Sequence, residues 1–283
     1  MRNNIVLLTY PGHFLLSKLA IESIKKISPQ SNITVIADNI SNLTWNGYID
    51  DCKVFYGVEV IPTNQTLNLL TMFKGDGWLR QQMVKLNLDR FLPGDLWYVT
   101  DGDIICERLI GANEIPYNYQ TTHNPLINAQ QHMYIKHMLG INQKLQLNGE
   151  DIYTHHIPVR WVTRDDLHSL YRHVSDVNQN DANIAHFNLM RKERIIGYGP
   201  TPEHLSMTEW DLLETWRILI DEQQPKYRYW ILDDGAAPRK NVPVSRLKTF
   251  FGTDRDFSQE YFENQGLQVP ADAWKKVLEI SRT

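Results

Sequence analysis

Two aspartates, Asp101 and Asp103, follow a strongly apolar segment at a spacing that suits a divalent cation. Residues two apart on an extended chain point the same way, and Gly102 between them lets the backbone turn tightly. Both carboxylates can then reach one ion. Because hard oxygen ligands suit Mg²⁺ or Mn²⁺, we predict a metal site at Asp101 and Asp103.

Continuous apolar runs predict the strands that position this pair. Residues 4–9 and 33–38 are short and almost uninterrupted, which is typical of strands buried on both faces of a parallel sheet. Residues 94–106 predict a strand that runs into the Asp-x-Asp pair and then continues as apolar chain. A helix predicted at residues 14–27 joins the first two runs as a right-handed β-α-β unit. A further strand is expected at residues 54–61.

The predicted strand ends bring polar side chains to one edge of the sheet. Tyr10 follows the first strand, Asp38 ends the second, and Asp101 and Asp103 end the third. Ligands bind beyond the carboxyl ends of strands in open sheets, so we expect these residues to surround the site.

The second part of the chain is less regular. A strand is predicted at residues 155–162, and a short helix with an acidic start at residues 165–174. Another helix is predicted at residues 206–220, where Ser206 and Glu209 have the spacing of a capping box. Residues 112–150 show few clear periods.

Composition indicates an ordinary globular protein. The chain has 283 residues, 42% of them hydrophobic, and a net charge of −4, so it lacks the basic excess of proteins that hold nucleic acid mainly through phosphates. Cys52 and Cys106 cannot form a disulfide framework. Reduced cysteines, and the lack of an uncharged apolar run of membrane-spanning length, predict a soluble cytoplasmic protein.

The motifs around the aspartate pair resemble those of nucleotide-sugar glycosyltransferases of the A-type fold, the group that includes glycogenin and bacterial galactosyltransferases. A predicted helix at residues 78–91 carries Arg80 and Lys85, Leu92-Pro93-Gly94-Asp95 follows, and the next strand ends in Asp-x-Asp. The resemblance implies one Rossmann-like α/β domain with a mainly parallel sheet. Residues 1–110 would form its nucleotide-sugar-binding half, and residues 111–283 its acceptor-binding half and a smaller C-terminal lobe.

The resemblance also implies roles for individual residues. Asp101 and Asp103 would hold Mn²⁺ or Mg²⁺ against the donor diphosphate, and Tyr10 and Asp38 would surround the nucleoside. Arg80 or Lys85 would stabilise the departing diphosphate. A histidine of the second half often completes such a metal site. The candidates are His123, His155, His156, His186 and His204, and we favour His204 because it lies in a loop just before a predicted helix.

Catalysis by inversion would need a general base, and Glu209 is the best-placed carboxylate. We therefore count Glu209 and the metal ligand Asp103 as candidate catalytic residues. Trp210 and Trp161 are candidates for stacking against an acceptor sugar. Glu209 equally fits a purely structural helix cap, and a retaining reaction would need no such base.

The acceptor and the reaction class stay open. The acceptor is a saccharide, a lipid-linked glycan, a protein side chain or a hydroxymethylated base in phage DNA. A DNA acceptor requires base flipping and a local basic cleft. Arginines and lysines that could form such a cleft are Arg160, Arg164, Arg172, Arg191, Lys192, Arg194, Arg239 and Lys240. The alternatives are a nucleotidyltransferase, a silent nucleotide- or glycan-binding module, and a metal-dependent phosphatase or nuclease.

Overall fold

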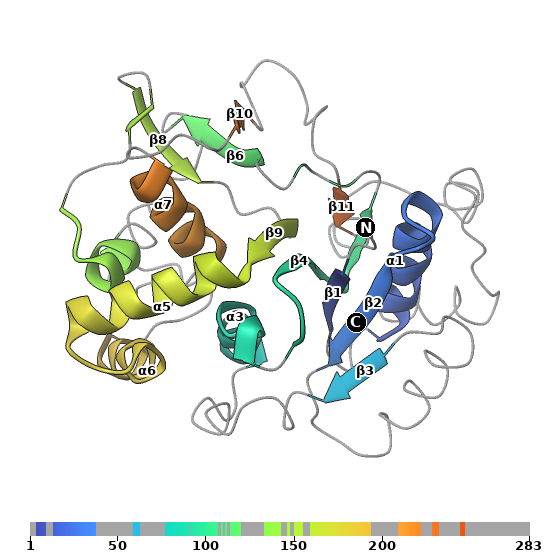
Figure 1. Cartoon of the computed structure of the whole chain (residues 1–283), viewed down its shortest axis with the longest axis horizontal. Coiled ribbons are helices and arrows are strands. Elements are labelled where there is room, and N and C mark those ends of the chain that lie inside the picture. Colours follow the sequence, from blue (N-terminus) through green and yellow to red (C-terminus); the bar gives the residue numbers. More distant parts are fainter. Residues whose placement is uncertain are drawn as a thin grey trace.

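The fold is an α/β structure with a mostly parallel sheet at its centre (Figure 1). The computed structural model describes residues 4–9, 14–37, 59–62, 77–90, 92–106, 109, 111, 114–119, 133–142, 146–147, 150–154, 159–193, 209–221, 228–231 and 244–246.

Five strands form the central sheet in the order β3-β2-β1-β4-β9. They are β1 (Asn4–Thr9), β2 (Asn32–Ala37), β3 (Glu59–Pro62), β4 (Leu96–Asp101) and β9 (Val159–Thr163). The first four run parallel, whereas β9 pairs antiparallel with β4. Helix α1 (Phe14–Ile27) joins β1 to β2, as predicted. The expectation of a Rossmann-like, mainly parallel α/β sheet is confirmed.

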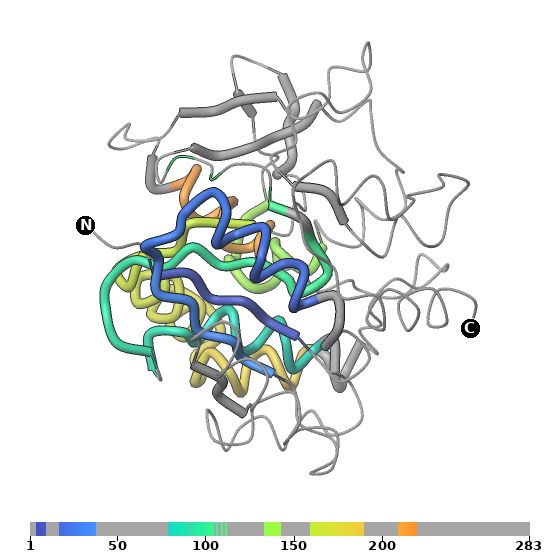
Figure 2. The backbone as a smooth tube through the Cα atoms, turned by 90° about the vertical axis from the view of Figure 1, so that its right-hand side faces the viewer, coloured from blue at the N-terminus to red at the C-terminus, as the bar shows by residue number. Residues whose placement is uncertain are grey.

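Helices cover both faces of the sheet. Ile5 and Leu7 of β1 belong to the same buried cluster as Ile21 of α1, whereas Val6 and Leu8 belong to a cluster with the helices of the other face. Those helices are α3 (Gly77–Leu86), α5 (Arg164–Asn178), α6 (Ala182–Glu193) and α7 (Glu209–Asp221). In Figure 2, α1 (blue) lies in front of the sheet, and α5 and α6 (yellow) lie behind it. Burial on both faces explains the continuous apolar sequence of β1.

A tight turn follows the central strand. β4 ends at Asp101, and Gly102 and Asp103 lead into β5 (Ile104–Cys106). A Cβ atom at Gly102 would lie 2.8 Å from the Leu8 carbonyl oxygen and 2.9 Å from the Thr9 Cβ. Glycine is therefore required because the end of β1 packs directly against this turn. β5 then leaves the central sheet and pairs antiparallel with β11 (Val244–Arg246).

A second sheet combines strands in and just after residues 112–150 with one strand much later in the sequence. Its strands, in the order β10-β6-β8-β7, are β10 (Arg228–Ile231), β6 (Glu114–Tyr119), β8 (Glu150–Thr154) and β7 (Gln146–Leu147). Residues 133–139 are helical. None of these elements was predicted, and neither was α6.

Several helix boundaries differ from the predictions for local reasons. The helix predicted at residues 78–91 ends at Leu86, and a 3-10 turn, η5 (Leu88–Arg90), follows. Asn87 between them donates its side-chain amide to the Met83 carbonyl at 2.8 Å, which competes with helical pairing. α5 is longer than predicted, and the Thr163 hydroxyl caps it by accepting from the Asp166 amide. No helix in the described ranges is long and apolar enough to cross a membrane.

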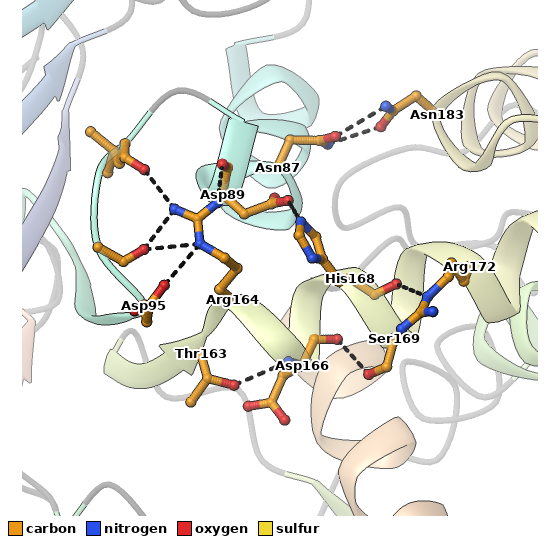
Figure 3. Close-up of polar contacts among 12 residues, drawn as sticks. Asn87, Asp89, Asp95, Thr163, Arg164, Asp166, His168, Ser169, Arg172 and Asn183 are labelled. Carbon is orange, nitrogen blue, oxygen red and sulfur yellow. Dashed lines mark hydrogen bonds and ion pairs between the residues drawn. The ribbon is translucent and has the colours of Figure 1, made fainter.

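Arg164 fixes the turn that precedes β4 (Figure 3). Its guanidinium donates to the Gly94 carbonyl at 2.6 Å, the Asp89 carbonyl at 2.9 Å and the Leu92 carbonyl at 3.3 Å. It also contacts the Asp95 carboxylate at 3.1 Å. Gly94 has a φ of +97°, a conformation that favours glycine. One side chain at the start of α5 therefore holds the entry to the central strand.

Replacing Arg164 with Ala is expected to lower the free energy of unfolding by about 1–3 kcal/mol, because several carbonyls lose their donor. Urea denaturation monitored by circular dichroism measures this loss. The matched control is Arg172→Ala on the same helix, since Arg172 is exposed and its Nε makes a single long contact, 3.4 Å to the His168 carbonyl. An equal loss of stability in both variants would contradict the role of Arg164 in holding the turn before β4.

Candidate functional site

A buried lysine joins two carboxylates that lie far apart in the sequence. Lys85 Nζ on α3 lies 2.8 Å from Asp101 Oδ1 at the end of β4 and 2.7 Å from Glu209 Oε1 at the first residue of α7. The side chains of Lys85 and Glu209 are 1% and 0% exposed, and that of Asp101 is 12% exposed. The ammonium therefore ties the start of α7 to the end of the central strand.

One face of α3 supplies further contacts to the two carboxylates. Gln81 Nε2 donates to Asp101 Oδ1 at 3.1 Å. Gln82, with its amide nitrogen turned toward Glu209, donates to that carboxylate. Gln81 and Lys85 are four residues apart, so they share a helix face. The Lys85 ammonium also lies 5.0 Å from the ring centroid of Trp210, a cation–π distance.

Burial and pairing shift the pKa values within this cluster. Burial alone would lower the pKa of the Lys85 ammonium, but the carboxylates of Asp101 and Glu209 outweigh burial and raise that pKa. Burial raises the pKa of Glu209, Lys85 opposes that rise, and Asp101 adds to it. Lys85 is thus held in its charged form, and Glu209 is a stronger base than an ordinary glutamate.

The donor set at the end of β4 fits a hard divalent cation. Asp101 and Asp103 are both buried, and their carboxylate oxygens are the ligand type that Mg²⁺ and Mn²⁺ prefer. The cluster contains the carboxylates of Asp101, Asp103 and Glu209 and the ammonium of Lys85. When all four groups are ionised their charges sum to −2, which a divalent ion balances. Within the described residues, no group of three or more His, Cys, Asp or Glu side chains forms a complete metal site.

Comparison with solved structures decides the fold. The galactosyltransferase LgtC, in complex with donor and acceptor sugar analogues, matches with a TM-score of 0.52 and 14% sequence identity, covering 97% of this chain and 100% of LgtC. The chain has the A-type glycosyltransferase fold. An active-site mutant of LgtC matches with a TM-score of 0.50 and 13% identity over 97% of this chain and 100% of LgtC. No protein-family model matches the chain, and neither does any curated protein sequence.

Within this A-type glycosyltransferase fold, two aromatic predictions need correction. Trp210 is 0% exposed and Trp161 is 8% exposed, and each belongs to a hydrophobic core cluster. The Trp161 ring packs edge-on against Tyr98 at a centroid separation of 5.2 Å. A ring that stacks on an acceptor sugar needs an exposed face. The structure therefore argues against acceptor stacking by either tryptophan.

The prediction that Glu209 is a general base also changes. A base must reach the proton that it removes, but the Glu209 carboxylate is fully buried and contacts Lys85 and Gln82. α7 begins at Glu209, and Ser206, the expected capping partner, lies outside the described residues. The contact of Glu209 with Lys85 instead indicates a positioning role.

Other predicted residues are only partly placed. Tyr10, Asp38 and His204 lie outside the described residues, so their roles stay predictions, as do the proposed halves 1–110 and 111–283. Arg80 lies half-buried on α3, and its donor-binding role stays a prediction. Two members of the suggested basic cleft have other contacts. Arg160 is fully buried, with its Nε 2.8 Å from Glu214 Oε1, and Arg164 holds the turn before β4.

Two buried residues next to the lysine cluster were missed as a pair. The Tyr134 hydroxyl and His186 Nδ1 lie 2.6 Å apart, and both side chains are buried. Burial, with a smaller effect of the Glu209 charge, raises the pKa of Tyr134 well above its ordinary value. His186 was considered as a metal ligand, but its ring contacts Tyr134 on the helical segment 133–139. No motif or spacing in the sequence links these two positions.

His186 makes stability depend on pH. Burial lowers the pKa of its imidazole from 6.5 to about 3, so the unfolded chain takes up this proton first as the pH falls. The contribution of His186 to the free energy of unfolding is fully present above pH 6.5. It declines as the pH falls toward the folded-state pKa, and about 2 kcal/mol of it is lost at pH 5. Urea denaturation at pH 7 and pH 5 tests this, with His186→Asn expected to lose that share of the pH dependence. An unchanged difference in the variant would contradict the assignment.

Proposed function

We propose that this protein is a metal-dependent glycosyltransferase that moves a sugar from a nucleotide-diphosphate-sugar to an acceptor hydroxyl. The observation that carries the proposal is Asp101 at the carboxyl end of the central strand of an A-type glycosyltransferase fold, held by Lys85 and Gln81. Ligands of open α/β sheets bind at this edge.

The side chains around Asp101 suit the binding of a donor diphosphate. Asp101 and Asp103 would hold Mn²⁺ or Mg²⁺, which when bound supplies positive charge to the departing nucleoside diphosphate. Lys85 and Gln81 fix the orientation of the Asp101 carboxylate, and Glu209 holds the Lys85 ammonium from the opposite side. The site is thus organised before the donor binds, which favours stabilisation of developing charge.

We take a saccharide hydroxyl as the first acceptor to test, because two of the cations suggested for a DNA-binding cleft are engaged within the protein. A DNA acceptor needs several cations that face the duplex phosphates. Arg160 is buried and Arg164 is bound to backbone carbonyls, so neither contributes to such a surface. Transfer assays with oligosaccharides and with hydroxymethylated duplex DNA compare the two acceptors directly.

A thermal-shift series with UDP, GDP, CDP, ADP and dTDP, each with and without Mn²⁺, tests donor binding. A ligand that binds only the native state at one hundred times its Kd adds about 2.7 kcal/mol of stability. We expect a Mn²⁺-dependent rise in Tm with one of these diphosphates. A folded protein that responds to none of them would contradict the proposal and favour a silent module or a metal-dependent hydrolase. Transfer of the nucleotidyl group in place of the sugar would favour a nucleotidyltransferase.

A further inference from the structure

A cavity lies between η5 and α5, outside the lysine cluster. Its volume is about 480 Å³, and the described residues that line it are Asp89, Arg90, His168, Tyr171 and Arg172. This volume is within the range of small-molecule sites. From this lining we propose that the cavity binds the phosphoryl group of a small phosphorylated molecule.

The cavity lies near the start of β4, whereas Asp101 lies at the end of that strand. In the pairing of β4 with β9, Leu96 is opposite Thr163, and α5 begins at the next residue. Asp101 ends β4 five residues beyond Leu96, which is about 17 Å along an extended strand. The cavity is therefore separate from the proposed donor site.

The acidic side chain in the cavity already has a partner. His168 Nε2 lies 2.7 Å from Asp89 Oδ2, and the Asp89 side chain is only 8% exposed (Figure 3). The nearby Asp181 carboxylate accepts a hydrogen bond from the Tyr171 hydroxyl. The lining therefore presents the guanidinium groups of Arg90 and Arg172, while its one carboxylate, Asp89, contacts His168 and the nearby Asp181 contacts Tyr171 and attracts Arg90.

The two arginines are suited to bind a phosphoryl group together. The Arg90 guanidinium lies 4.2 Å from the centroid of the Tyr171 ring, a cation–π distance that holds this cation at the cavity. Among the described residues, Arg172 has no carboxylate partner, and only its Nε contacts a carbonyl. Both arginines are exposed. Forked N–H groups match phosphoryl oxygens in two-point contacts.

A small ligand fits this cavity better than a nucleic acid does. Nucleic acids are held by many phosphate contacts along an extended basic surface, and the chain as a whole has a net charge of −4. Two arginines in one concave site match a single phosphoryl group.

Phosphorus NMR titration of the full chain with inorganic phosphate, in EDTA so that no divalent ion occupies the aspartate pair, tests this site. We expect saturable binding that weakens at least about tenfold in Arg172→Gln and in Arg90→Gln. Lys26→Gln on α1 removes the same charge far from the cavity, and Asp103→Asn alters the other site, so both should bind within about twofold of the original chain.

The outcomes separate the alternatives. Absence of saturable binding, or equal weakening in Lys26→Gln, would overturn the site. Loss of binding in Asp103→Asn would assign the phosphate to the donor site. Displacement of phosphate by a short DNA duplex at lower concentration would assign the arginines to a nucleic-acid surface. If Arg90→Gln fails to fold because the contact with Tyr171 is lost, Arg172→Gln still decides the result.

Discussion

Asp103→Asn is expected to lower metal-dependent sugar transfer by about 100-fold or more while leaving the fold intact. The substitution removes a negative charge from the proposed metal site, and stabilisation of the departing diphosphate depends on the ion held there. Asp103 lies in the turn after β4, whereas the carboxylates that contact Lys85 are those of Asp101 and Glu209. Steady-state kinetics at several Mn²⁺ concentrations measure the effect.

Asp95→Asn is the matched control for this prediction. Asp95 precedes the same strand at its other end, its side chain is 90% exposed, and its contact is with Arg164. The same charge is removed, so a general electrostatic effect would appear in both variants. Full activity in Asp103→Asn would show that the aspartate pair is not the metal site.

Lys85→Met is expected to lower the free energy of unfolding by about 3–5 kcal/mol, because removing one partner of a buried ion pair leaves uncompensated charge. Two carboxylates lose their cation in this case, since Lys85 contacts both Asp101 and Glu209. Donor binding should also weaken as the Asp101 carboxylate loses its fixed orientation. Urea denaturation at pH 7 gives the stability, and titration with a nucleoside diphosphate and Mn²⁺ gives the binding.

A double variant separates the charge effect from the loss of packing. Adding Glu209→Gln to Lys85→Met removes one of the two buried charges that the single variant leaves behind, so part of the stability should return. Lys26→Met on the exposed face of α1 controls for the loss of a surface lysine. A loss below about 1 kcal/mol in Lys85→Met would mean that the lysine is not the buried link between α3, β4 and α7.

The central sheet was predictable because its signal is local. β1, β2 and β4 are buried on both faces, so each reads as a continuous apolar run that ends near a polar residue. The second sheet has no such signal. β7 has two residues and β6 contains Pro116, so their pairing depends on partners elsewhere in the sequence.

In the candidate site, too, local motifs were predictable and contacts between distant residues were not. Asp101, Asp103 and Lys85 were predicted from motifs within a stretch of fewer than 20 residues. The pairing of Lys85 with Glu209 spans 124 residues, and only the folded chain brings them together. The spacing of residues also did not predict which side chains are buried. Glu209 and Trp210 begin a helix with acidic residues in its first turn, and yet both are fully buried. Residue types and spacing thus predicted that Lys85 and Asp101 belong to one site, but not which side chains remain accessible.

Release of the nucleoside diphosphate from a panel of nucleotide-diphosphate-sugars is the most direct test of the proposed function. The purified protein is incubated with each donor and Mn²⁺, with and without a mixture of saccharide acceptors, and the free diphosphate is quantified. We predict release from one donor that requires Mn²⁺, rises with acceptor and is lost in Asp103→Asn. A folded protein that leaves every donor intact, or that releases diphosphate equally well in Asp103→Asn, would contradict the proposal.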